Sequence, residues 1–278
     1  MNGLQKIRSI VFKHATTIFI IILAIFVYVR MPLFFTPTSL LNLSSQAAIF
    51  GTVTIGMTFL MITRVADISL GAQVYLGGII GVRVYLATGN MFFTLLASMV
   101  VCLIASTING ICIVKYGLPD MITTMSMQFI CNGIANLIVG KESVVNVADQ
   151  KFQALGQSRF LGLPVSVWFL FGLMLIGGLL LHKTKFGRYV YAAGNNPDAL
   201  EASGINVFMV RMSTFWISGA LAGFAGIVNV SRLGGATFAL AKGLEDVYKR
   251  QGKMSGGVKV FYVSKRGAHN RSPEGMTE

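Results

Sequence analysis

Apolar residues run through this chain in long segments separated by short polar ones. Residues 91–114 carry no charge, and a helix of 24 residues at about 1.5 Å per residue is longer than a hydrocarbon core of about 30 Å. A backbone inside a bilayer must satisfy its own hydrogen bonds, so the expected fold class is all-α, a polytopic transmembrane helix bundle. Seven segments predict its spans, near residues 15–35, 46–63, 68–88, 91–114, 121–140, 163–181 and 212–230.

Composition agrees with this class. The chain is 54% hydrophobic and 12% charged, whereas a soluble domain has about 25% charged residues. The net charge of +13 comes from Lys and Arg in the loops and the tail, which indicates membrane topology and anionic lipid rather than nucleic acid. The three cysteines (Cys102, Cys112 and Cys131) lie in apolar segments and are expected to be small buried residues.

Basic residues also suggest an orientation. Lys6, Arg8 and Lys13 precede the first span and no cleavage site follows it, so residues 15–35 are interpreted as a retained helix. With a cytoplasmic N-terminus, more of the basic loop residues lie inside than outside, as the positive-inside rule favours. Residues 184–205 then lie in the cytoplasm. Residues 141–160 form an extracytoplasmic loop with a short surface helix.

The segment 184–205, TKFGRYVYAAGNNPDALEASGI, contains a short capped helix between two apolar spans. Asn196 fits the N-cap, Pro197 the first helical position, Asp198 the positive end of the helix dipole and Gly204 a left-handed exit. A helix over 197–203 is only about 10 Å long and needs a packing partner.

Two interpretations of this short helix stay open on spacing alone. It rests on the membrane surface, aided by Lys183, Lys185 and Arg188. Alternatively it docks onto a partner protein through an apolar set made of Ala199, Leu200 and Ile205.

The same stretch resembles the cytoplasmic coupling loop of permease subunits from bacterial ABC sugar importers of the ribose, galactose, xylose and autoinducer-2 type. The family pattern T-x-F-G-R…A-x-G-x-N…A…S-G-I is matched at Thr184, Phe186, Gly187, Arg188, Ala193, Gly194, Asn196, Ala199, Ser203, Gly204 and Ile205. A second match places the family's G-M-T…D-L-S-V-G signature at Gly56, Met57, Thr58, Asp67, Ser69 and Gly71. It departs where the family has small residues and this chain has Arg64, Val65 and Ala66.

A third segment, GLPDMITTMSMQFICNGIANLIVG, is similar to the family's Thr-rich helix after a proline, and the resemblance covers roughly residues 45–245. It implies a coupling helix that docks in a groove of a separate ATPase, made of Asn196, Pro197, Asp198, Ala199, Leu200, Glu201, Ala202, Ser203 and Gly204. It also implies an external sugar-binding protein (periplasmic or lipid-anchored), a second permease copy and a place in the bacterial inner membrane. The chain carries no G-x-x-x-x-G-K-[ST] motif, so no cofactor is expected here, and ATP with Mg²⁺ belongs to the partner ATPase.

Polar residues in the fifth predicted span suggest a substrate path. Thr124, Gln128, Asn132 and Asn136 recur every four residues, which predicts one helical face directed into the bundle. Amide side chains can donate to and accept from sugar hydroxyls. The alternative for this stripe is hydrogen bonding between helices.

The remaining ionisable residues do not suggest catalysis. Asp67, aided by Ser69, is predicted to cap the third span, and Asp120 to cap the fifth. The resemblance assigns no role to Asp67, Ser69 or Gly71. No acid pair or metal-like cluster stands out, so a transport subunit is expected rather than an enzyme.

The end of the chain departs from the family. Residues 1–245 are expected to form the permease domain, whereas 246–278 are polar, basic and without a span. We interpret this tail as artefactual and disordered, with the family's last spans missing; a divergent lipid-binding tail is the alternative. Two other functions stay open: a secondary transporter driven by an ion gradient, for which Asp67 and Arg83 are the candidate ionisable residues, and a truncated fragment that does not transport.

Overall fold

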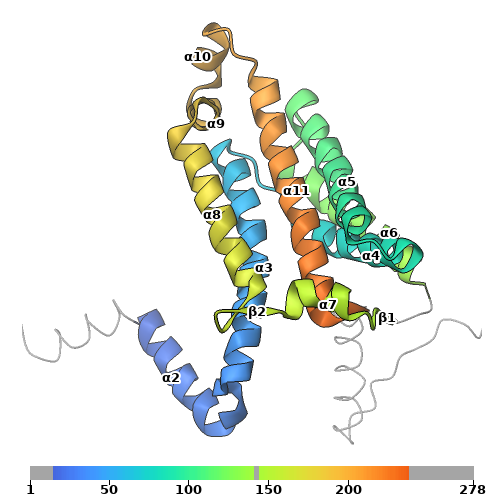
Figure 1. Ribbon diagram of the computed structural model, residues 1–278. Coiled ribbons are helices and arrows are strands. Elements are labelled where there is room, and N and C mark those ends of the chain that lie inside the picture. Colours follow the sequence, from blue (N-terminus) through green and yellow to red (C-terminus); the bar gives the residue numbers. More distant parts are fainter. Residues whose placement is uncertain (1–14, 141–143, 238–278) are drawn as a thin grey trace, which may run out of the picture. The chain divides into compact units, whose positions relative to one another are not determined.

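The computed structural model describes residues 15–140 and 144–237, so the predictions for the N-terminal basic residues and for the tail at 246–278 lie outside the described residues. Within this part, six helices are long and apolar enough to cross a membrane (Figure 1). They are α3 (Pro37–Ile62), α4 (Leu70–Thr88), α5 (Met91–Gly110) with its π-helical continuation η2 (Ile111–Lys115), α6 (Asp120–Val139), α8 (Val165–Lys183) and α11 (Val207–Leu233). The expected all-α polytopic bundle is confirmed.

The first predicted span differs from the structure. Helix α2 (Ala15–Arg30) has 16 residues and is followed by the 3₁₀ helix η1 (Pro32–Phe35), so residues 15–35 do not form one membrane-length helix. A helix of this length reaches about 24 Å, short of a core of about 30 Å. It ends where Pro32 follows, because the residue before a proline disfavours the α conformation. The described residues therefore hold six such helices, where the sequence predicted seven.

The second predicted span starts too late. Helix α3 begins at Pro37, nine residues before the predicted start at 46, because Thr36 accepts a hydrogen bond from the Ser39 amide and Pro37 occupies the first turn. Thr followed by Pro is a signal for a helix start, but the polar residues that follow Pro37 made the segment look like a loop. Helix α11 likewise begins five residues before the predicted start at 212, where Asn206 accepts from the Met209 amide. The other four helices begin and end within two residues of their predicted ranges when η2 is counted as the end of α5.

Helix α11 is the centre of the packing. It lies most extensively against α5, α4 and α3. Three of its glycines allow this: a Cβ on Gly223 would lie 2.6 Å from Cα of Met99, one on Gly226 would lie 2.5 Å from O of Val74, and one on Gly219 would lie 2.9 Å from O of Cys102. Glycines at helical spacing therefore let the backbones of α4 and α5 approach α11 closely.

The shorter elements lie at the two ends of α11. At one end α9 (Lys185–Asn195) and α10 (Pro197–Ala202) connect α8 to α11, and at the other lies α7 (Gln150–Gln157) (Figure 1). The paired strands are β1 (Val144–Asn146) with β4 (Gly235–Thr237), and β2 (Arg159–Phe160) with β3 (Leu163–Pro164). We call these ends of the bundle the α10 end and the α7 end.

Helix α7 is the short helix expected in the loop 141–160. Asp149 caps it by accepting from the Lys151 amide, and it also accepts from the Tyr85 hydroxyl of α4. The Tyr85 hydrogen bond lowers the pKa of the Asp149 carboxyl. Gly156 then touches the α11 backbone at Arg232. Contacts to α4 and α11 therefore hold α7 in place.

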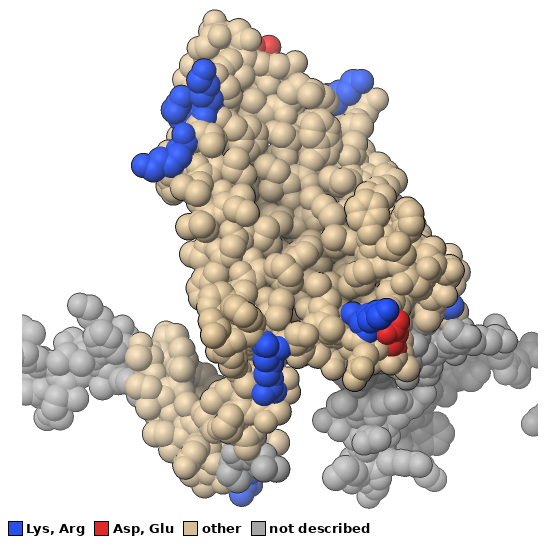
Figure 2. Space-filling view, in the orientation of Figure 1, with Lys and Arg blue, Asp and Glu red and all other residues tan. Residues whose placement is uncertain are grey.

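Charged side chains keep to the two ends of the face drawn in Figure 2. Lys and Arg atoms gather near both ends, and a broad band between them carries only uncharged residues. Of the six helices α8 is the least buried: only 11% of the residues in its most apolar stretch are buried. Both features fit a chain whose middle is surrounded by hydrocarbon.

We expect Gly223→Ala to destabilise the bundle, because its new methyl group would overlap the α5 backbone. Overpacking of this kind costs about 1–3 kcal/mol. The measurement is the unfolding temperature of the detergent-solubilised chain. Gly172→Ala is the matched control, since nothing lies within 4 Å of a Cβ at that α8 position. Equal unfolding temperatures for the two variants would contradict the close contact between α11 and α5.

Candidate functional site

The segment between α8 and α11 forms two helices joined at Asn196. Thr184 caps α9 by accepting from the Gly187 amide, and Asn196 caps α10 by accepting from the Ala199 amide at 3.0 Å. Pro197 takes the first turn of α10, and Gly204 has φ of 78° beyond its end. The capped short helix predicted over 197–203 is confirmed, and it is one residue shorter than expected.

Two glycines fix α9 against the ends of α8 and α3. A Cβ on Gly194 would overlap the carbonyl oxygen of Ile62, and one on Gly187 would overlap that of Leu181. Arg211 of α11 adds a hydrogen bond to the carbonyl of Ala193, at 3.2 Å. Both glycines belong to the loop pattern that carried the family resemblance. The structure gives the reason for these glycines: any side chain would prevent the α9 backbone from contacting the ends of α3 and α8.

The apolar side of the segment is buried in this chain's own core. Val190, Ala193, Leu200 and Val210 form one cluster, with Ile205 packed against it. Leu200 is 6% exposed, so its predicted role as an apolar contact for a partner is wrong. A helix this short gains its stability from such packing, which uses up its apolar residues. The exposed residues of α10 and its exit are Asp198, Ala199, Glu201, Ala202, Ser203 and Gly204.

A buried polar network lies between the α3–α4 loop, α4 and α5. Asp67 is 2% exposed and accepts from the amide and the hydroxyl of Ser69, at 2.8 and 2.6 Å. The Asn109 amide donates to Ser69 Oγ at 3.0 Å and, more weakly, to Asp67. Gln73 donates to Ser69 Oγ and accepts from the Ser106 hydroxyl, both at 2.8 Å.

The structure corrects the prediction that Asp67 caps the third span. Helix α4 begins at Leu70 after Ser69, which has helical backbone angles, so Asp67 is not its N-cap. Burial raises the pKa of the Asp67 carboxyl, and the hydrogen bonds from Ser69, Asn109 and Gln73 oppose that effect. Sequence reasoning missed Gln73 and Asn109, although polar residues inside predicted spans are themselves a signal of buried networks. The third signature residue, Gly71, is exposed, and no atom lies within 4 Å of a Cβ there.

Asp120 is the first residue of α6 and not its N-cap, which is Pro119, so the predicted cap is wrong and Asp120 instead bonds α6 to the α3–α4 loop. Helix α6 begins at Asp120, whose Oδ1 accepts from the Met121 amide at 2.9 Å. Its Oδ2 accepts from the Ala66 amide in the α3–α4 loop, at 3.0 Å. The same loop contains Arg64 in a left-handed conformation, φ of 62°, where the family has small residues. This loop therefore joins the end of α3, on which α9 rests, to the start of α6.

The sequence predicted that the polar stripe on α6 points into the bundle, and in this chain it does so fully only at Thr124. Thr124 is buried, Gln128 and Asn132 are half-buried and Asn136 is exposed. A four-residue repeat advances about 40° beyond a full turn at each step, so the stripe winds off the packed face. The three amide side chains make no hydrogen bond to the described part of the chain.

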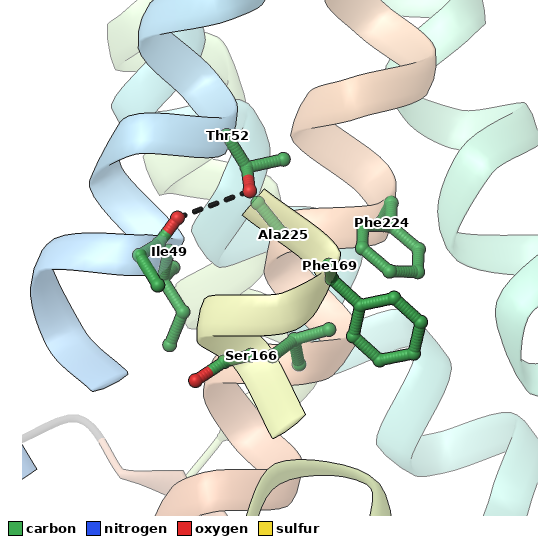
Figure 3. A pocket seen from close by; sticks show the side chains of 8 residues that line it. Ile49, Thr52, Ser166, Phe169, Phe224 and Ala225 are labelled. Carbon is green, nitrogen blue, oxygen red and sulfur yellow. Dashed lines mark hydrogen bonds between the residues drawn. The ribbon is translucent and has the colours of Figure 1, made fainter. Parts of the chain in front are cut away.

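A small hollow between α3, α8 and α11 is not a substrate site. It has no room for a water molecule, and the Phe169 and Phe224 rings pack edge to face across it at 5.2 Å (Figure 3). Thr52 donates to its own helix at Ala48 O, the dashed line in Figure 3. Its lining residues are Ala48, Ile49, Thr52, Ser166, Phe169, Phe224, Ala225 and Val228. We interpret it as a packing gap.

Comparison with known proteins identifies a family. The family model described as "Branched-chain amino acid transport system / permease component" matches residues 39–245. The ribose import permease protein RbsC of Escherichia coli K12 is 28% identical over 237 residues, 84% of this chain and 74% of that protein. RbsC of Bacillus subtilis 168 is 31% identical over 213 residues, 76% of this chain and 66% of that protein.

A permease for a second sugar is also similar. The L-arabinose transport system permease protein AraH of Escherichia coli K12 is 30% identical over 203 residues, 73% of this chain and 62% of that protein. No solved structure matches this chain. The recognition made from the loop motifs, a permease of the ABC sugar importers, is confirmed at the level of the family.

We expect Asp120→Ala to destabilise the chain more than Asp198→Ala does. The first change removes the acceptors for the part-buried Ala66 amide and the exposed Met121 amide, and losing a hydrogen bond to a charged acceptor costs at most about 1.5–3 kcal/mol here. Asp198 is an exposed acid in the first turn of α10, so its loss tests charge alone. Unfolding temperatures in detergent measure the difference. Asp120→Asn, which keeps an oxygen acceptor, should fall between the two.

Proposed function

The chain belongs to the family described as the permease component of branched-chain amino acid transport systems, and on that basis we propose that it is the membrane subunit of an ATP-driven sugar importer. The names of its relatives, permeases for ribose and L-arabinose, favour a pentose, hexose or similar sugar as cargo. An external binding protein would deliver the sugar. A separate ATPase would bind ATP with Mg²⁺.

The observation that carries the proposal is the fixed α9–α10 segment at the α10 end. The exposed surface of α10, centred on Ala199 and Ala202, would dock in the ATPase groove. Movement of α10 would reach α3 through the contact between Gly194 and Ile62, and α11 through the Arg211 hydrogen bond. From α3 it would reach α6 through the Ala66–Asp120 hydrogen bond. ATP binding can then favour one bundle state, provided that the docked ATPase binds the two states with different affinity.

The amide stripe supports a path at the edge of this chain. Gln128, Asn132 and Asn136 leave their hydrogen-bonding groups open at a surface of α6, where hydrocarbon would be costly. A second permease copy across this face would enclose them, and a sugar could bond to them in the space between the copies. Interhelical hydrogen bonding is the competing role.

Orientation follows from the same assignment. Docking to an ATPase requires the α10 end to face the cytoplasm, which places the α7 end outside and agrees with the basic residues at the end of α8. The start of α3 at Pro37 would then lie on the outer side, so the expected cytoplasmic N-terminus would require the residues before Pro37 to cross the membrane, and α2 with its 16 residues is shorter than such a span.

The arrangement does not favour a secondary transporter. That class would need an intramembrane ionisable residue paired for ion coupling. Asp67 is instead hydrogen-bonded by Ser69, Gln73 and Asn109, and no ionisable side chain is among these partners.

We expect bulky residues on the exposed surface of α10 to block coupling. The double variant Ala199→Trp/Ala202→Trp should lower sugar uptake and sugar-stimulated ATP hydrolysis at least about tenfold, equal to about 1.4 kcal/mol of docking free energy. Both would be measured in vesicles containing the chain, its ATPase and its binding protein. Ala154→Trp, at another exposed alanine, on α7, is the control. Normal hydrolysis in the α10 variant would reject the coupling role.

We expect Gln128→Leu/Asn132→Leu to reduce uptake while leaving the unfolding temperature in detergent unchanged, because neither amide bonds within the described part of the chain. Ser126→Ala, an exposed change on the same helix, is the control. Unchanged uptake would exclude the stripe from the path. Loss of self-association in cross-linking would assign the amides to contacts between copies instead.

A further inference from the structure

The strands β2 and β3 form a hairpin with an unusual tip. Phe160 pairs with Leu163, which leaves Leu161 and Gly162 as the two loop residues. Both have positive φ, 51° and 81°. Two-residue hairpin loops of this kind strongly prefer Asn-Gly, because asparagine and glycine tolerate left-handed backbone. A leucine there is disfavoured by its side chain.

The tip is also apolar and outward-facing. Leu161 is 77% exposed and Phe160 is 60% exposed. A water-facing turn would gain from a polar residue at either position. The leucine therefore carries two separate disadvantages, a strained backbone and an exposed apolar surface. Strain that persists at one exposed residue points to a role outside the fold.

The hairpin is held rigidly on the first turn of α8. The Val165 amide donates to the carbonyl of Ser158, and the Trp168 indole donates to the carbonyl of Phe160, both at 3.0 Å. The Phe160 and Trp168 rings also pack edge to face at 5.9 Å. The position of α8 in the bilayer therefore fixes the position of the tip.

Helix α8 places the hairpin at a membrane boundary. Its 19 residues span about 28 Å, close to the thickness of a hydrocarbon core. One end carries His182 and Lys183, and the hairpin lies at the other. The apolar residues Phe171 and Leu175 are exposed on α8 between these ends. When the basic end lies among headgroups, the hairpin lies at the opposite interface, beside lipid.

We propose that the β2–β3 tip is an interfacial anchor, in which Phe160 and Leu161 insert into the boundary between headgroups and acyl chains at the α7 end of the bundle. Trp168 lies where aromatic residues are enriched in membrane proteins. Arg159, exposed on β2, is placed to meet lipid phosphate. The occupant is the bilayer itself, and the anchor sets the depth of α8 whatever the chain transports.

The test places a fluorophore at the tip of the full chain in phospholipid vesicles. Leu161→Cys is made in a Cys112→Ser background, where the other native thiols, Cys102 and Cys131, are buried. Lys151→Cys on α7 is the exposed control at the same end. We expect the Leu161 label to be quenched by a nitroxide near the lipid headgroup and to be several-fold less sensitive to iodide than the control.

Three other results would overturn the anchor. Equal iodide quenching at both positions would place the tip in water. Protection from both quenchers would place it against a second copy of the chain. Protection that begins only when an external binding protein is added would make it a protein-docking site.

A turn substitution separates anchoring from folding. Leu161→Asn creates the preferred Asn-Gly loop, so it should leave the unfolding temperature unchanged or raise it. With the label moved to Ser158→Cys, the same substitution should weaken quenching by the lipid nitroxide, because the hairpin loses its inserted side chain. Unchanged quenching would show that Leu161 does not hold the hairpin in the interface.

Discussion

Close backbone contact at glycine is the constraint on which this bundle depends. Inside a bilayer, burying apolar side chains between helices gains little, since lipid is equally apolar. Association must come from packing and hydrogen bonds. Gly223 and Gly226 bring α5 and α4 against α11, and the Ser98 hydroxyl donates to the carbonyl of Gly223 at 2.8 Å. The same device recurs outside the spans, where Gly194 and Gly187 seat α9 on the ends of α3 and α8.

Hydrogen bonds between polar side chains add to the backbone contacts at glycine in holding the helices together. The Asp67 network lies between the α3–α4 loop, α4 and α5. Among the buried side-chain polar atoms of its described residues, only Asn109 Oδ1 has no hydrogen-bond partner. The loop that holds Asp67 also donates to Asp120. The short stretch from Ile62 to Ser69 thus touches α9, the Asp67 network and α6. Its contacts are the bond from the Ala66 amide to Asp120 and the buried Asp67 carboxylate, so both ends of the loop are tied to neighbouring helices.

The sequence predicted the class, most spans and the capped helix, because these follow from local pattern: long apolar runs and an Asn-Pro start. It failed where structure depends on distant partners. The Ala66 amide that bonds Asp120 is 54 residues away. Leu200 looked available to a partner because its own cluster, which draws on α3 and α11, is invisible in a local window. The stripe on α6 was misplaced because spacing by four only approximates the helical repeat.

The central position of α11 has a consequence for biogenesis. It is the last of the described helices in the chain, yet it contacts α3, α4, α5, α7 and α9. Helices α3, α4 and α5 are made before α11, their main packing partner, so the surfaces that contact it are left without that partner for a time. Quality-control proteases and insertion chaperones act in that interval. Sequence changes in α11 would therefore alter how much protein accumulates even when the finished bundle tolerates them.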